Sequence, residues 1–226
     1  MKPETLFFTA VHGNEGFSVP IIEKLSKQFE FDWLIANPAA YEKNIRYCDA
    51  DLNRSGPGEE NSNLYEQQLA FRLIKKGKEY DQIIDIHGTN ADTGVFIILG
   101  DPNWQNIELA KKFDIANVVL WPGLIPTGPL CQFIPNSLEI ECGPKTSYST
   151  TQELNRVLTA FLDKQAPTVN QNYFIVTGKL NGPKIDYFKD FQETTLNNNT
   201  FYPLLANQYK DTTCYMMQKL NNDQMI

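Results

Sequence analysis

The 226-residue sequence has little of several features that large classes of protein need. Its four cysteines are scattered and never spaced as C-x-x-C, so nothing indicates a disulfide framework or a cysteine-based zinc site. It has no apolar run of membrane-spanning length, and its N-terminus lacks a signal-peptide core. With 20 Lys and Arg against 27 Asp and Glu, the net charge of −7 argues against binding to a nucleic-acid backbone. We therefore expect a cytoplasmic protein without membrane or nucleic-acid partners.

The residues that are present predict one full folded domain with a small appendage. A hydrophobic share of 42% and a charged share of 21% are ordinary for a folded chain. Strand-like apolar runs alternate with stretches of helical spacing up to about residue 164. This alternation predicts an α/β domain, with a mixed central sheet flanked by helices, over residues 1–168. The pattern beyond it predicts a small β-rich C-terminal subdomain over residues 169–226.

Both histidines of the chain follow predicted strands. His12 ends the run 6–11 and is followed three residues later by Glu15, and His87 ends the run 83–86. Because ligands of open α/β sheets bind where the strands end, these three side chains are candidates for one His₂Glu zinc site. The alternatives are a solvated loop at His12 and a buried core histidine at His87. Asp85 lies on the same strand face as His87 and is a candidate to orient it.

A third predicted strand, residues 137–142, carries Glu139 and Glu141 on one face. A carboxylate at the end of this strand is a candidate general base beside a metal site. The alternative is an amphipathic edge strand with solvated carboxylates. For Glu139 we expect the solvated arrangement, and for Glu141 both interpretations stay open.

Residues 38–62 are predicted to form a long irregular loop, which in a compact domain is usually functional. Two of the four arginines, Arg46 and Arg54, lie in it, and Asn53 adds neutral donors. A guanidinium group matches a carboxylate by two hydrogen bonds, and a second one stabilises an oxyanion. Asp49 and Asp51 are candidates to hold the arginines. The alternative is a surface loop with ordinary salt bridges.

Taken in order, these segments resemble the succinylglutamate desuccinylase/aspartoacylase family, a zinc carboxypeptidase-like group. The matching segments cover roughly residues 5–165: His12-Gly13-Asn14-Glu15, Asn37-Pro38, Arg46-Tyr47-x-Asp49-x-Asp51-Leu52-Asn53-Arg54, Asp85-Ile86-His87 and Ile140-Glu141-Cys142-Gly143-Pro144. The D-x-D-L-N-R run is the most specific of them. The resemblance implies a zinc-peptidase-like fold for the main domain.

The resemblance also implies a role for each candidate residue. His12, Glu15 and His87 would bind one Zn²⁺ per chain. Glu141 would be the general base and Arg46 would stabilise the oxyanion. Asn53 and Arg54 would bind the α-carboxylate of the substrate, and Tyr209, in the C-terminal part, would be a further substrate-contacting residue.

The chain departs from the family in one position of the substrate site. Aspartoacylases carry a further substrate-binding arginine about ten residues before the catalytic glutamate, whereas this chain has Cys131 there and no arginine between residues 73 and 155. The nearest basic residue after Glu141 is Lys145. The identity of the substrate therefore does not follow from the resemblance.

These observations lead to a zinc-dependent amidohydrolase that splits a small anionic N-acyl amino acid. Two alternatives remain: a zinc carboxypeptidase acting on short peptides, and a catalytically inactive relative that binds a carboxylate. The sequence leaves open whether the chain forms a homo-oligomer.

Overall fold

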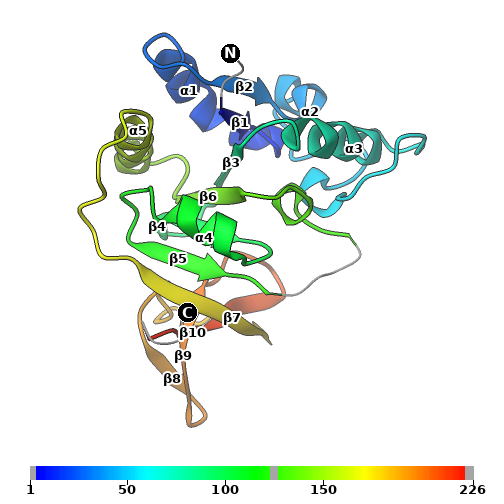
Figure 1. The fold of residues 1–226 in the computed structure, drawn as a ribbon. Coiled ribbons are helices and arrows are strands. Elements are labelled where there is room, and N and C mark those ends of the chain that lie inside the picture. Colours follow the sequence, from blue (N-terminus) through cyan, green and yellow to red (C-terminus); the bar gives the residue numbers. More distant parts are fainter. Residues whose placement is uncertain (1–3, 123–126, 222–226) are drawn as a thin grey trace.

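The computed structural model describes residues 4–122 and 127–221, and its centre is one ten-stranded sheet (Figure 1). The order of the strands is β2-β1-β3-β6-β4-β5-β7-β10-β9-β8. Their bounds are β1 Thr5–Thr9, β2 Asp32–Ile35, β3 Gln82–Gly88, β4 Gly94–Leu99, β5 Asn117–Leu120, β6 Ser137–Gly143, β7 Asn172–Asn181, β8 Thr194–Leu196, β9 Asn199–Leu204 and β10 Thr212–Lys219.

Helices lie beside this sheet, as the alternating pattern predicted. Their bounds are η1 Gly13–Ser18, α1 Val19–Leu25, α2 Pro38–Glu42, η2 Leu52–Arg54, α3 Tyr65–Gly77, α4 Trp104–Ala110, η3 Leu130–Phe133 and α5 Tyr148–Leu162. The loop expected over 38–62 therefore contains α2 and η2 and is less irregular than predicted. Pro38 at the start of α2 and Asn37, whose side chain accepts from the Ala40 N–H, begin that helix. None of the helices in the described residues combines the length and the apolar composition of a membrane span.

The sheet is mixed, which confirms the predicted fold class. Strands β2, β1, β3 and β6 run parallel, β4 pairs antiparallel with β6, and β5 and β7 continue parallel to β4. The last strands, β10, β9 and β8, pair antiparallel. Beyond residue 168 the described residues form β7 to β10 and no helix. Since β7 pairs with β5, the sheet continues through residue 168, and the domain boundary there stays a prediction.

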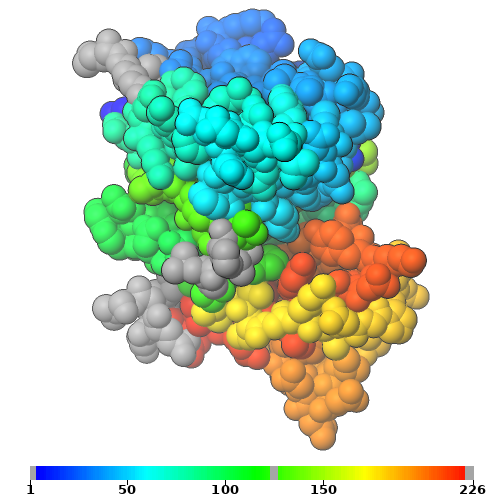
Figure 2. Space-filling model, turned by 90° about the vertical axis from the view of Figure 1, so that its right-hand side faces the viewer, coloured from blue at the N-terminus to red at the C-terminus, as the bar shows by residue number. Residues whose placement is uncertain are grey.

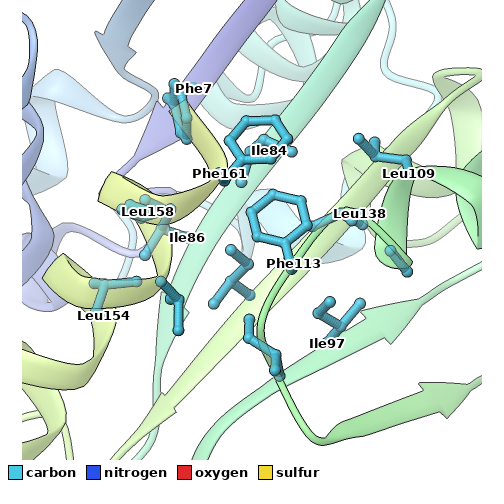
Figure 3. Packing of buried hydrophobic residues seen from close by; sticks show 14 of the residues in the cluster. Phe7, Ile84, Ile86, Ile97, Leu109, Phe113, Leu138, Leu154, Leu158 and Phe161 are labelled. Atoms are coloured by element: carbon cyan, nitrogen blue, oxygen red, sulfur yellow. The ribbon is translucent and has the colours of Figure 1, made fainter. Parts of the chain in front are cut away.

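One face of the sheet carries a large apolar cluster. Alternate residues of the strands, such as Phe7, Ile84 and Leu138, pack against Phe113 of the α4–β5 connection and Phe161 of α5 (Figure 3). Helices α1, α4 and α5 all contribute buried side chains to this cluster. A face that buries this much hydrocarbon supplies the main driving force for folding.

The other face is divided into three parts. At one end, residues of α3 such as Leu73 cover Leu6 and Phe8, and at the other end Phe96 and Ile98 belong to a cluster shared with β5, β7, β9 and β10. The middle of this face carries polar side chains instead, because strands β3 and β6 place carboxylates and a histidine there. The functional site therefore lies between two apolar clusters that hold its surroundings in place.

Candidate metal and substrate site

His12, Glu15 and His87 meet at the ends of β1 and β3. Nδ1 of His12 lies 3.1 Å from Oε1 of Glu15, and Nδ1 of His87 lies 3.5 Å from Oε2 of Glu15. One ligand atom from each of the three residues lies within 4.8 Å of the others, and all three side chains are buried. The sequence placed these residues at strand ends, and the structure brings them together.

The other nitrogen of each imidazole faces a carboxylate. Nε2 of His12 lies 3.0 Å from Oδ1 of Asp51, and Nε2 of His87 lies 3.0 Å from Oδ2 of Asp85. The expected contact between Asp85 and His87 is present. Each carboxylate turns Nδ1 of its histidine towards Glu15, which is the orientation that metal-ligating histidines receive from their neighbours.

Two properties of this cluster fit a metal ion. Nδ1 of His12 is buried and, apart from its contact with Glu15, has no polar partner among the described residues. Burial raises the pKa of Glu15, but hydrogen bonds from His12 and His87 lower it further than burial raises it, so the carboxylate is ionised. Two imidazoles and one carboxylate match a zinc donor set.

The first loop needs Gly13 for close packing. A Cβ atom on Gly13 would lie 2.1 Å from the carbonyl carbon of Ala40, so no side chain fits there. The backbone of Gly88 contacts the site directly, because its N–H donates to Oε2 of Glu15 at 3.0 Å. Each His-Gly pair therefore brings a backbone segment into contact that a larger residue would prevent.

The register between β3 and β6 determines where the two glutamates lie. Asp85 is opposite Glu139 and His87 is opposite Glu141, so all four side chains share one face. The expectation of a solvated Glu139 is wrong. Strand β6 lies between β3 and β4 rather than at an edge, and Glu139 is buried.

Glu141 is the less buried of the two glutamates and lines the cavity beside the histidines. Burial and the negative charges of Glu15 and Glu139 raise the pKa of Glu141 to about 8, against the opposing effects of His87 and Lys145. A carboxyl group with a pKa near neutrality can both take up and release a proton.

The loop over residues 38–62, called the arginine loop below, contacts the cluster of His12, Glu15 and His87 through Arg46. Nε and Nη2 of Arg46 donate to Oδ2 of Asp51 at 3.1 and 2.9 Å, and Nη1 of Arg46 lies 3.7 Å from Glu15. Asp51 therefore holds an arginine as expected. Asp49 does not, because it accepts from the N–H of Tyr65 at the start of α3. Asn53 accepts from the Leu130 N–H at 3.4 Å.

Glu66 is an important residue that the sequence analysis missed. It is fully buried and accepts from the backbone N–H groups of Cys48, Asp49 and Ala50 at 2.7, 2.9 and 3.0 Å, and from the side chain of Asn37 at 3.2 Å. These donors lower its pKa against the effect of burial. The helical spacing of the sequence could have indicated that Glu66 is buried. It lies on the apolar stripe of α3, three and four residues before buried Leu69 and Ala70.

The eight residues to which the family resemblance assigns a role all line one cavity of about 420 Å³. Tyr209 is among them, 40% exposed, in the segment between β9 and β10. Figure 2 shows the orange to red C-terminal segments directly below the blue and cyan segments on this face. The sequence analysis proposed no role in the site for several further residues of the lining, among them Ile98, Trp121, Gln132, Leu205 and Tyr215.

Solved structures share this fold across almost the whole chain. Murine aminoacylase 3 covers 97% of this chain and of its own, with a TM-score of 0.77 at 18% identity. A succinylglutamate desuccinylase/aspartoacylase from Rhodobacter sphaeroides covers 98% of this chain and 87% of its own, with a TM-score of 0.76 at 15% identity. At these identities the likeness establishes the fold.

Sequence relatives match part of the chain. A protein of Prochlorococcus marinus (strain CCMP1986) named "Probable aspartoacylase" is 34% identical over 154 residues, which are 61% of this chain and 52% of the relative. A protein of the same name from Nostoc is 36% identical over 141 residues, or 55% and 45% of the two chains. The chain spans about half the length of the curated relatives it matches. The family model of the succinylglutamate desuccinylase/aspartoacylase catalytic domain matches residues 2–163. The chain therefore belongs to the succinylglutamate desuccinylase/aspartoacylase family.

Proposed function

We propose that the protein is a zinc-dependent amidohydrolase that cleaves an N-acyl amino acid into a carboxylate and a free amino acid. The observation that carries this proposal is the buried His₂Glu cluster with Glu141 on the neighbouring strand and Arg46 above it. A zinc ion held by His12, Glu15 and His87 would activate water and polarise the scissile carbonyl.

The arginine loop supplies the groups that hold the substrate. Arg54 and Asn53 bind the α-carboxylate, with Tyr209 closing the cavity from the C-terminal side. Arg46 points its guanidinium towards Glu15, which places positive charge where the carbonyl oxygen becomes negative. Asp51 fixes that guanidinium by two hydrogen bonds, so its position does not have to be established during the reaction.

Glu141 moves the proton. It accepts a proton from the attacking water as the C–O bond forms, and delivers a proton to the nitrogen as the C–N bond breaks. The acyl group leaves as a carboxylate and the amino acid leaves as an amine. The raised pKa of Glu141 suits both transfers near neutral pH.

The replacement Glu141→Gln tests this proposal most directly. We expect amine release from N-acyl amino acids to fall by at least about 100-fold, because general acid–base catalysis contributes that much or more, while zinc stays bound. The control is Glu23→Gln, a surface carboxylate on α1 that pairs with Lys27. Metal content is measured on the same samples. Activity that survives Glu141→Gln would refute the assignment of the base.

The same assay addresses the two alternatives. A carboxypeptidase would release amino acids from dipeptides and longer peptides, whereas tight carboxylate binding without turnover would indicate an inactive relative. A cytoplasmic location and a homo-oligomeric state stay predictions.

A further inference from the structure

The cavity holds few positive charges that are available to a substrate. Among the described residues of the lining, Arg46, Arg54 and Lys145 are the cations. Arg46 is paired with Asp51 at 2.9 Å, and Nζ of Lys145 lies 3.8 Å from Glu15. The guanidinium of Arg54 donates to the carbonyl oxygen of Asn53 at 2.6 Å and forms no ion pair with a described carboxylate. One cation therefore remains for one substrate carboxylate.

A second carboxylate on the substrate would meet buried carboxyl groups where β3 and β6 pair. Glu139 lines it, is buried, and has an Oε1 atom without a hydrogen-bond partner among the described residues. Asp85 is its neighbour across the β3–β6 pair. Placed beside these two buried carboxyl groups, a second substrate carboxylate would lose its hydration without gaining a cation of its own.

Another part of the lining, which begins at the cross-strand neighbour of Glu139, is apolar. Ile98, Trp121, Leu205 and Tyr215 line the cavity, and all four belong to or pack against one buried cluster. The rings of Trp121 and Tyr215 meet edge to face at a centroid distance of 4.6 Å. This wall buries hydrocarbon favourably and offers no cation, so it suits an alkyl or aromatic group and disfavours a carboxylate.

We propose that the substrate is a monocarboxylate: an N-acyl amino acid whose acyl group or side chain is apolar and lies on the wall formed by Ile98, Trp121, Leu205 and Tyr215. Its single carboxylate binds Arg54. N-acyl amino acids with a second carboxylate, whether in the side chain or in the acyl group, are disfavoured. This inference rests on the proposed hydrolase function and narrows its substrate class.

Two matched pairs of substrates test it with the zinc-loaded protein. The first pair is N-acetyl-leucine and N-acetyl-aspartate, and the second is N-hexanoyl-glycine and N-succinyl-glycine. We expect the apolar member to have the higher kcat/KM, by about tenfold or more, in at least one pair and the acidic member in neither. A preference for the acidic member in either pair, or equal rates in both, overturns the inference but leaves the hydrolase function standing.

If none of the four compounds is hydrolysed, the proposed hydrolase function fails. The relative affinity for N-acetyl-leucine and N-acetyl-aspartate then tests the preference for a monocarboxylate. Quenching of tryptophan fluorescence by N-acetyl-leucine at lower concentration than by N-acetyl-aspartate would support it, and the reverse order or equal affinity would overturn it.

Three variants test which residues cause the preference for apolar over acidic substrates. Trp121→Ala removes part of the apolar wall and should reduce the ratio of apolar to acidic kcat/KM, while Trp104→Ala, an exposed tryptophan on α4, should leave it unchanged. Glu139→Gln keeps the size of the side chain, so it guards against a Trp121 variant that fails to fold. It should raise kcat/KM for the acidic members relative to the apolar ones. An unchanged ratio in Glu139→Gln would remove Glu139 from the inference, and an unchanged ratio in both Glu139→Gln and folded Trp121→Ala would overturn it.

Discussion

Two carboxylates in this protein hold a loop by its backbone N–H groups, one beside the site and one far from it. Glu66 binds three consecutive N–H groups, those of Cys48 to Ala50, under the arginine loop. Asp114 binds the N–H groups of Thr168 and Val169 at 2.7 and 3.0 Å, where the chain passes from α5 towards β7.

Glu66 and Asp114 differ in the side chain that binds each of them in addition to these backbone N–H groups. Asp114 also pairs with Arg156, whose side chain is 47% exposed, whereas Glu66 is fully buried and takes the neutral side chain of Asn37 instead. Neutral donors satisfy Glu66 completely, so neither Arg46 nor Arg54 is needed to neutralise it. The comparison shows how a loop rich in arginine can be fixed while its guanidinium groups stay directed at the cavity.

Within this comparison, the largest effect is expected from Glu66→Ala. It leaves three backbone N–H groups without their acceptor, and each buried unsatisfied group costs about 1–3 kcal/mol. Because displacement of a positioning group by about 1 Å can cost about 100-fold in rate, we expect kcat/KM to fall by that order. Steady-state kinetics and urea unfolding measure both effects.

The matched variant is Asp114→Ala, which removes the acceptor of Thr168 and Val169. It should lower the free energy of unfolding without changing kcat or KM at a temperature where the variant is folded. If the two variants lose kcat/KM to the same extent, Glu66 has only a general structural role.

Bound zinc should change the stability loss caused by Glu66→Ala but not the loss caused by Asp114→Ala. Asp51 contacts both His12 and Arg46, so the arginine loop and the proposed metal ligands form one network. We expect the loss of unfolding free energy in Glu66→Ala to differ by about 1 kcal/mol between zinc-loaded and chelated protein, since residues of one network couple by that order. The loss in Asp114→Ala should be the same in both. Equal losses for Glu66→Ala with and without zinc would contradict the coupling.

The smallest expected effect is one of pH, and it has opposite signs for two aspartates. Hydrogen bonds from Arg156 and Thr168 lower the pKa of Asp114 to about 2, so its contribution to stability is present above pH 4 and is lost as the pH falls towards 2. Burial raises the pKa of Asp190 to about 6. The native state then binds the extra proton, so this contribution declines as the pH rises from about 4 to 6.

Asp190→Asn tests this sign. It should remove that decline and raise the free energy of unfolding at pH 7 relative to pH 4, compared with the unmodified chain. Denaturant unfolding at pH 4, 5, 6 and 7 measures the slope. The same slope in both proteins would show that Asp190 does not titrate in this range.

Much of the candidate site could be predicted from the sequence, because it depends on the spacing of nearby residues. The alternation of Asp85 and His87, and of Glu139 and Glu141, follows from the two-residue period of a strand. The burial of Glu139 did not follow, because nothing in residues 137–142 says whether the strand is central or at an edge. Glu66 was missed although its helical phase marks it as buried, since a glutamate on an apolar stripe gives no indication of the loop that it binds.

The sequence by itself determined the α/β class, the strand that precedes His12, the strand that carries His87, and the family. Those properties depend on residue types and on short spacings along the chain, which do not change with the tertiary structure. Only the tertiary structure decided that β6 lies between β3 and β4, that Glu66 lies under Cys48 to Ala50, and that Trp121 and Tyr215 share one wall. These arrangements join segments between 16 and 94 residues apart, and they depend on how the whole sheet packs rather than on any local pattern.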